Sequence, residues 1–414
     1  MYLKLKIYTL KNGVRLVVNE LSGIYSVSFG VFVGAGSSNE EENENGISHF
    51  IEHVTFKGTE KRSSFDISND AEMIGADINA YTTRNLTCYY IKSTTEHVSE
   101  AFEILSDVVL NSVYKKEELE KEKSVVLQEI NMCDDTPDDL CADLLMQAYF
   151  GKNGYGAPIL GTPATVKSFT RDDVLNYRKK YYTADNIVVS VCGGVKAEDI
   201  YPLVEKYFGA VEETKASKKP CINCENLRQS LAINKDINQT HICLGFPAVG
   251  LTDEEVDLYN IATYVLGGGM SSRLFQSVRE NLGLCYSVYS FMTAYVDCGF
   301  SMVYAGVDQE RVDECYDAIL KETEKLRRHK ITAEEFKRSS EQMKSGLTFS
   351  EESASSQMQI HGKRLLLLGD VLDFKERLKR INKFTINDVN GLIDRLFDKN
   401  NVAKAIVGKD VKPL

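Results

Sequence analysis

Hydrophobic and polar positions along this 414-residue chain alternate in short stretches, which are separated by longer stretches with helical spacing. Residues 9–16 surround Asn12-Gly13, a dipeptide that favours a tight hairpin turn between two strands. Residues 77–90 are rich in Thr and Tyr, which favour strands. Further strands are predicted at 186–191, 240–246 and 401–407.

Two stretches with helical spacing stand out in the first half. Residues 47–56 form a short, partly apolar helix after the loop Gly34–Ser38. Residues 117–132 contain strong helix formers and neither Gly nor Pro, with Val125, Val126 and Ile130 as an apolar stripe. In the second half, helices are predicted at 273–281 and 333–347.

The order of these elements occurs twice along the chain. Gly267–Ser272 corresponds to Gly34–Ser38, the helix 333–347 to 117–132, and the strand 401–407 to 186–191. Such a repeat predicts two similar domains. Because strand runs are followed by helix runs within each half, we expect an α+β fold.

The length of the chain also exceeds what one core normally supports, so two domains are expected. We predict a first domain at residues 1–211, a polar linker at 212–227 containing Lys218-Lys219-Pro220, and a second domain at 228–414.

Composition narrows the possible functions. With 43% hydrophobic and 26% charged residues the chain is globular, and its longest aliphatic run, Leu365–Leu368, is too short to span a membrane. The N-terminus alternates and lacks a secretory signal, so we expect a cytoplasmic location and no membrane. A net charge of −11 argues against nucleic acid as a partner. The ten cysteines lack a framework spacing, and the lone pair Cys221 and Cys224 is interpreted as chance.

The string His49-Phe50-Ile51-Glu52-His53 is the strongest sign of chemistry. On a helix, His49 and His53 share one face, so two imidazoles can meet at one point, and Glu52 projects beside it. Two neutral imidazoles suit zinc, and a nearby carboxylate suits a general base acting on water. Two histidines alone bind zinc weakly, so a third ligand is expected elsewhere.

The helix 117–132 offers candidates for that third ligand. Glu122 and Glu129 lie two turns apart and therefore share a face. A glutamate in a charged helix is usually solvated surface, and the pattern alone does not select Glu129.

Residues 49–59 (HFIEHVTFKGT) and 122–139 (EKSVVLQEINMCDDTPDD) resemble the zinc peptidases of the pitrilysin-type (insulinase) family, in particular its bacterial processing-peptidase-like subfamily. The resemblance implies two related α+β domains facing each other across a cavity. It also implies Zn²⁺ as cofactor, with His49, His53 and Glu129 as ligands, Glu52 as the base, and Glu122 as a residue that supports the ligands.

The resemblance extends to residues that would bind substrate. Arg279 and Tyr286 match an Arg and Tyr with which the family binds the substrate carbonyl and stabilises the oxyanion. Asn79 and Ala80 match contacts to the backbone of an extended peptide that pairs with an edge strand. Asn85 departs from the family, which usually has Glu there.

The function predicted on this basis is zinc-dependent cleavage of extended peptides, by a homodimer that binds peptide substrates. Two alternatives stay open: a non-catalytic scaffold, and one subunit of a two-chain peptidase that divides the zinc motif and the Arg/Tyr pair between chains. The intact HxxEH string argues against the first, and the presence of both features argues against the second.

Overall fold

The computed structural model describes residues 4–217, 222, 224–371 and 373–414, which form two compact units. Unit 1 is formed by the described residues of Met1–Ile130, Pro158–Cys221 and Thr348–Asp373, and unit 2 by those of Asn131–Ala157, Ile222–Leu347 and Phe374–Leu414. Each unit therefore contains a segment from the opposite half of the sequence, which the predicted contiguous domains 1–211 and 228–414 lack. Part of the predicted linker 212–227, including Lys218-Lys219-Pro220 and Cys221, lies outside the described residues.

Unit 1 contains a six-stranded sheet with the order β1-β2-β6-β3-β5-β4. The strands are β1 (Lys4–Thr9), β2 (Arg15–Glu20), β3 (Ser26–Val33), β4 (Asp77–Thr82), β5 (Thr87–Thr94) and β6 (Ile187–Gly193). The helices are α1 (Ile47–Thr55), α2 (Ser64–Met73), α3 (Val98–Asn111), most of α4 (Lys116–Asp134), α6 (Pro163–Ser168), α7 (Arg171–Tyr181), α8 (Ala197–Phe208) and α12 (Ala354–Leu368).

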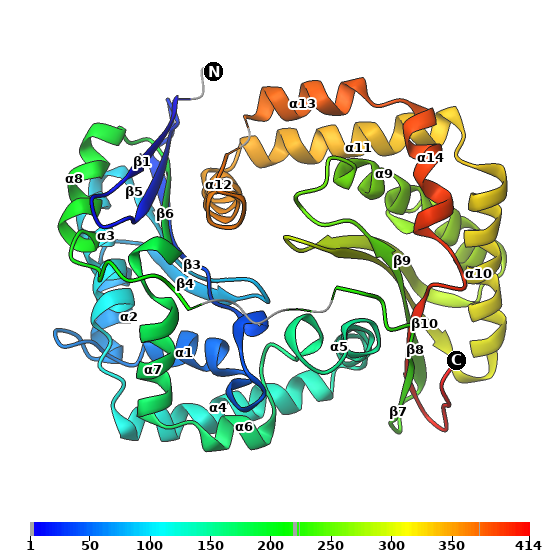
Figure 1. Ribbon diagram of the computed structural model, residues 1–414, viewed down its shortest axis with the longest axis horizontal. Helices are drawn as coiled ribbons and strands as arrows, with labels where there is room; N and C mark the ends of the chain where they lie inside the picture. Colours follow the sequence, from blue (N-terminus) through cyan, green and yellow to red (C-terminus); the bar gives the residue numbers. More distant parts are fainter. Residues whose placement is uncertain (1–3, 218–221, 223, 372) are drawn as a thin grey trace. The chain divides into compact units, whose positions relative to one another are not determined.

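Both faces of the sheet in unit 1 are buried. Alternation along the strands sends Phe29 and Val31 of β3 into the main core, where α3 and α8 also pack, and Phe32 to the opposite face. On that opposite face, α12 supplies Met358 and Leu365. Figure 1 shows α12 on one side of this sheet and α3 and α8 on the other. A segment more than three hundred residues away in the sequence thus completes the first unit.

Unit 2 has a five-stranded sheet with the order β7-β11-β8-β10-β9. Its strands are β7 (Ser230–Asn234), β8 (Gln239–Ala248), β9 (Cys285–Ala294), β10 (Gly299–Asp308) and β11 (Ala403–Gly408). Its helices are α5 (Pro137–Phe150), α9 (Val256–Gly267), the π-helical turn η6 (Phe275–Asn281), α10 (Val312–His329), most of α11 (Ala333–Glu351), α13 (Phe374–Lys383) and α14 (Ile386–Leu396). Helix α5 packs Leu145 and Tyr149 against this sheet, as α12 does in unit 1.

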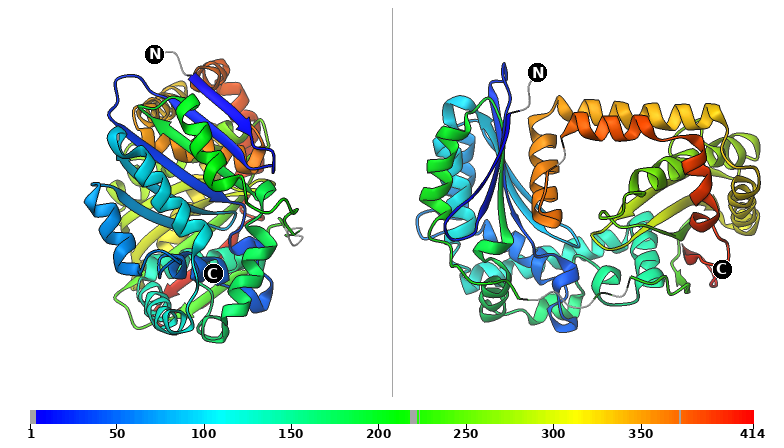
Figure 2. Two further views of the ribbon diagram at one scale, coloured as in Figure 1. Left: turned by 90° about the vertical axis from the view of Figure 1, so that its left-hand side faces the viewer. Right: turned by 45° about the horizontal axis from the view of Figure 1, so that its top comes forward.

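The predicted repeat is confirmed by the connectivity of the two sheets. Strands β2-β6-β3-β5-β4 occur in the same order, with the same single parallel pair at one end, as β7-β11-β8-β10-β9. Figure 2 shows the two sheets and their helices from two further sides. The predicted α+β fold and the hairpin around Asn12-Gly13 are also confirmed, since β1 and β2 pair antiparallel.

Three local predictions were wrong. Residues 77–90 form two strands, because the Thr83 amide donates to the Leu86 carbonyl, the Leu86 amide donates to the Thr83 hydroxyl, and these bonds close a turn between β4 and β5. Val125 is 45% exposed, so it does not join the apolar stripe of α4. Gly267–Ser272 follows α9, whereas Gly34–Ser38 follows a strand directly, so the two glycine-rich loops are not equivalent.

No helix in the described ranges combines the length and hydropathy that a membrane span requires.

Helix α1 begins where two glycines approach closely. Gly46 adopts φ +92°, and a Cβ there would lie 2.6 Å from Cα of Gly161. Gly46→Ala should therefore lower the free energy of unfolding by about 2–4 kcal/mol, because the left-handed backbone and the collision with Gly161 add. Gly23 has φ +81° and open space around a Cβ, so Gly23→Ala should cost about 1 kcal/mol. Equal urea midpoints for the two variants would contradict this account of how α1 is placed.

Candidate metal centre

Helix α1 carries His49, Glu52 and His53 and packs against β4 and β5 of the sheet in unit 1. Phe50, Ile51 and Val54 on the same helix are fully buried, which fixes the rotation of α1 about its axis. The His49 and His53 rings consequently lie beside each other, with centroids 4.5 Å apart. The side-by-side placement that the i, i+4 spacing predicts is confirmed.

Helix α4 supplies the carboxylate that completes the cluster. Leu119, Val126 and Ile130 anchor its buried side. Glu129 Oε2 then lies 3.3 Å from Nε2 of His53 and 3.7 Å from Nε2 of His49. Ligand atoms of these three residues all lie within 4.8 Å of one another.

The donor set fits a zinc ion. Zinc takes imidazole nitrogen and carboxylate oxygen at about 2.0–2.1 Å in a tetrahedral arrangement, which separates two donors by about 3.3 Å. The separations of Glu129 Oε2 from the two imidazole nitrogens match this value within a few tenths of an ångström. His49 is 6% exposed and its Nδ1 has no partner among the described residues, so its Nε2 is left as the ring atom facing Glu129.

Glu122 bonds to His53 Nδ1, the ring nitrogen that does not face Glu129. Its Oε1 lies 2.9 Å from His53 Nδ1, and its Oε2 lies 2.7 Å from the Lys57 ammonium. A neutral His53 therefore carries its proton on Nδ1, donates it to Glu122 and directs the Nε2 lone pair toward Glu129. Glu122 is 4% exposed, so water has little access to its bonds with His53 and Lys57.

Glu52 lies on the same face of α1 but is not among the three clustered ligands. Thr82, the last residue of β4, donates its hydroxyl proton to Glu52 Oε2. Burial raises the pKa of Glu52, although the bond from Thr82 opposes the shift. A carboxylate with a raised pKa is suited to accept and return a proton near neutral pH.

The two histidines differ in their protonation. Burial lowers the pKa of His49 to about 4, with a smaller contribution from His53, so His49 stays neutral. Burial also acts to lower the pKa of His53, but the bonds to Glu122 and Glu129 outweigh it and raise this pKa to about 9. The carboxylates of Glu122 and Glu129 stabilise a proton on His53 and would also stabilise a metal ion, so the proton and the ion compete.

The remaining predicted residues lie on strand β4 and in unit 2. Asn79 is exposed on β4, the last strand of its sheet, and its side chain accepts a 2.8 Å bond from the Ala80 amide. Arg279 lies on η6 with its guanidinium 4.9 Å from the ring centroid of Tyr286, which is 75% exposed. The structure brings Arg279 and Tyr286 together with each other.

Lys57 and Thr82 were missed from the sequence. Lys57 lies just beyond the end of α1 at Thr55, so helical spacing gave no signal that linked it to Glu122. Thr82 gave no signal, because its proximity to Glu52 depends on how β4 lies against α1.

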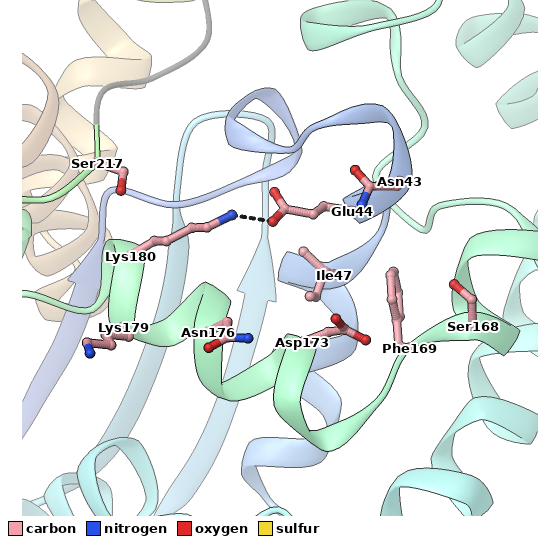
Figure 3. A pocket seen from close by; sticks show the side chains of 10 residues that line it. All are labelled: Asn43, Glu44, Ile47, Ser168, Phe169, Asp173, Asn176, Lys179, Lys180 and Ser217. Atoms are coloured by element: carbon pink, nitrogen blue, oxygen red, sulfur yellow. Dashed lines mark hydrogen bonds and ion pairs between the residues drawn. The ribbon is translucent and has the colours of Figure 1, made fainter.

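A large cavity in unit 1 lies at the start of α1 and holds none of the cluster residues. Its volume is about 700 Å³, and it is lined by residues of the loop before α1 and of α7. Figure 3 shows its lining side chains, among them Ile47 and Phe169, and the ion pair between Glu44 and Lys180.

Comparisons with known proteins agree on one family. Residues 16–163 match the family described as Insulinase (Peptidase family M16), and residues 168–343 match the Peptidase M16 inactive domain. The uncharacterized zinc protease YmxG of Bacillus subtilis is 40% identical over 399 residues, which cover 96% of each chain. An uncharacterized zinc protease of Streptomyces coelicolor is 33% identical and covers 93% of this chain and 85% of its own.

Solved structures agree on the fold. A protease from Helicobacter pylori superposes with a TM-score of 0.91 at 21% identity and covers 98% of this chain and all of its own. A putative M16-like peptidase from Alicyclobacillus acidocaldarius gives 0.87 at 20% identity over 98% of each chain.

The raised pKa of His53 predicts how the metal-free protein depends on pH. Because this pKa lies above the unfolded value of 6.5, the stabilisation is complete below pH 6.5 and is lost as pH rises through about 9. Glu122→Gln should therefore lower the free energy of unfolding by about 1–2 kcal/mol more at pH 6 than at pH 9.5, measured by urea unfolding in chelator.

The control for this experiment is Glu335→Gln, which breaks a carboxylate–guanidinium pair with Arg273 of 2.7 Å. A guanidinium stays charged throughout this range, so the control should lose equal stability at both pH values. A Glu122→Gln penalty that is also equal at both would refute the His53–Glu122 coupling.

Proposed function

Because the chain belongs to peptidase family M16, the insulinase family, we propose that it is a zinc-dependent endopeptidase that cleaves extended peptides. The observation that carries the proposal is the convergence of His49 and His53 from α1 with Glu129 from α4. These three residues would hold the ion, and the relatives named zinc proteases support the choice of metal.

When bound, zinc supplies a Lewis acid that polarises the scissile carbonyl and makes water more acidic. Glu52 accepts the proton of the attacking water at a carboxylate oxygen and passes it to the nitrogen of the leaving amine. Burial raises the pKa of Glu52, which makes its carboxylate a stronger base for this transfer. Thr82 orients the carboxylate, and Glu122 keeps the Nε2 lone pair of His53 available.

The substrate would bind by main-chain pairing along β4. In the described part of the sheet this strand pairs only with β5, and its outer edge carries Asn79 and Ala80. Pairing through backbone bonds tolerates many side chains, which predicts broad substrate choice. Arg279 and Tyr286 are proposed to bind the substrate carbonyl and stabilise the charge that develops on its oxygen.

The proposal extends to assembly and location. One chain contains both the HxxEH string and the Arg279–Tyr286 pair, so a homodimer of identical, self-sufficient chains is proposed. A cytoplasmic location is part of the same proposal. Size-exclusion chromatography of the protein expressed alone, with activity measured across the peak, tests the first of these.

Removing the proposed base separates chemistry from metal binding. Glu52→Gln should retain zinc, because Glu52 is not a ligand, and should lower kcat by about 10²–10⁴-fold because the amide cannot take a proton. The measurement is cleavage of a mixed fluorogenic peptide library, with zinc content by elemental analysis on the same samples.

Glu60→Gln is the matched control, since Glu60 is exposed just beyond the end of α1, and it should leave turnover unchanged. Near-wild-type turnover of Glu52→Gln would refute the assignment of the base. Zinc-loaded wild-type protein that cleaves no member of the library would favour the scaffold alternative.

A further inference from the structure

Helix α1 carries both proposed zinc-binding histidines but lacks a cap of its own. Its N-cap residue is Gly46, which has no side chain to accept the amide protons of the first turn. An uncapped helix start leaves up to four amide groups without partners, and burying them without a hydrogen bond is costly. Gly46 and Ser48 are both buried here, so their amides need an acceptor.

Glu40 provides that acceptor from outside the helix. Its Oε2 accepts a 2.7 Å bond from the Gly46 amide, and its Oε1 accepts a 2.9 Å bond from the Ser48 amide. The Asn45 side chain donates a further bond of 3.2 Å to Oε2. Glu40 lies between the short turns η1 (Ser37–Asn39) and η2 (Glu42–Glu44), and its carboxylate is 6% exposed.

The position of this charge matters for the cation that α1 would hold. The N-terminus of a helix carries partial positive charge, which disfavours a cation bound nearby. His49 lies in the first turn of α1, so this charge acts on the ion that His49 would bind. An ionised carboxylate bonded to the first-turn amides offsets this charge. Through its bond to Ser48, the residue before His49, Glu40 also fixes the backbone that carries the first imidazole.

We infer that Glu40 is a positioning residue for the metal centre, which caps α1 from a distance and offsets the positive end of the helix beside the bound cation. This inference rests on the proposed function, because it concerns the same zinc site. Glu40 is not one of the three clustered residues, and it acts through its bonds to the Gly46 and Ser48 amides.

Protonation of Glu40 gives the inference a distinctive signature. Burial raises the pKa of Glu40 to about 7, although the amides of Gly46 and Ser48 pull it down. The titratable groups that face it are Tyr177 and Tyr181 of α7, whose phenols burial keeps neutral by raising their pKa values. Among these three side chains, Glu40 is therefore the one whose charge changes between pH 6 and 8.5.

The experiment compares the zinc affinity of wild type and Glu40→Gln at pH 6, 7 and 8.5, by competition with a chromophoric chelator. At pH 8.5 the variant should bind zinc about tenfold more weakly, because it lacks the charge. At pH 6 the two proteins should converge within about threefold, because wild-type Glu40 is then protonated and resembles Gln. An affinity ratio that does not change with pH would overturn the electrostatic role.

Glu44→Gln is the matched control in the same loop, because Glu44 pairs with Lys180 and makes no bond to α1 amides in the described structure (Figure 3). It should leave zinc affinity unchanged at every pH. Glu40→Asp keeps the charge, so its affinity should stay closer to wild type than that of Glu40→Gln at pH 8.5. A loss as large as that of Glu40→Gln would assign the effect to shape alone.

Hydrogen exchange of the metal-free proteins makes the test independent of zinc. In Glu40→Gln the amides of residues 46–50 should exchange at least tenfold faster than in wild type, whereas those of α7 should not change. Unchanged exchange at 46–50 would overturn the cap. Wild-type protein that binds no zinc would refute the proposed function instead, and the exchange result would then decide the role of Glu40 as the cap.

Discussion

The proposed metal centre depends on one imidazole held between two carboxylates. His53 lies 2.9 Å from Glu122 on one side and 3.3 Å from Glu129 on the other, and both carboxylates belong to α4. These contacts join the helix that carries the HxxEH string to the helix that completes it. They also fix which ring nitrogen faces Glu129, so the geometry of the cluster and the protonation of His53 have the same cause.

Two effects shift the pKa values in the cluster: burial of the side chains and the nearby carboxylates. Glu122 and Glu129 contact the imidazoles and Glu52 lies near His53, while His49 is buried and His53 and Glu129 are partly exposed. Such surroundings favour a dication, and they also raise the pKa of His53 while burial lowers that of His49. Metal binding is therefore expected to release a proton from His53.

The sequence predicted the contacts that depend on local helix geometry. The remaining site residues came from the family resemblance. The spacing of His49 and His53 was enough to place both rings together, because helical geometry alone determines that contact. Glu129 could not be selected from its helix without the resemblance, since partners distant in sequence leave no local signal. The roles of Lys57 and Thr82 were missed for the same reason, and Gly267–Ser272 was misplaced because composition alone does not identify equivalent loops.

Sequence patterns could not predict which segments of the chain make up each unit. Helix α12 packs into unit 1 and α5 into unit 2, and each buries an apolar face there. The repeat itself was predictable, because strand and helix runs keep the same order in both halves. The fold of the whole chain decides which sheet α5 or α12 covers, and the sequence of the helix alone does not show it.

X-ray absorption at the zinc K edge tests the central claim most directly. The account predicts a first shell of nitrogen and oxygen at about 2.0–2.1 Å, with the multiple scattering of two imidazoles and without sulfur. Sulfur at about 2.3 Å would place zinc on cysteine, and a single imidazole would remove one histidine from the site. Either result would contradict a centre formed by His49, His53 and Glu129.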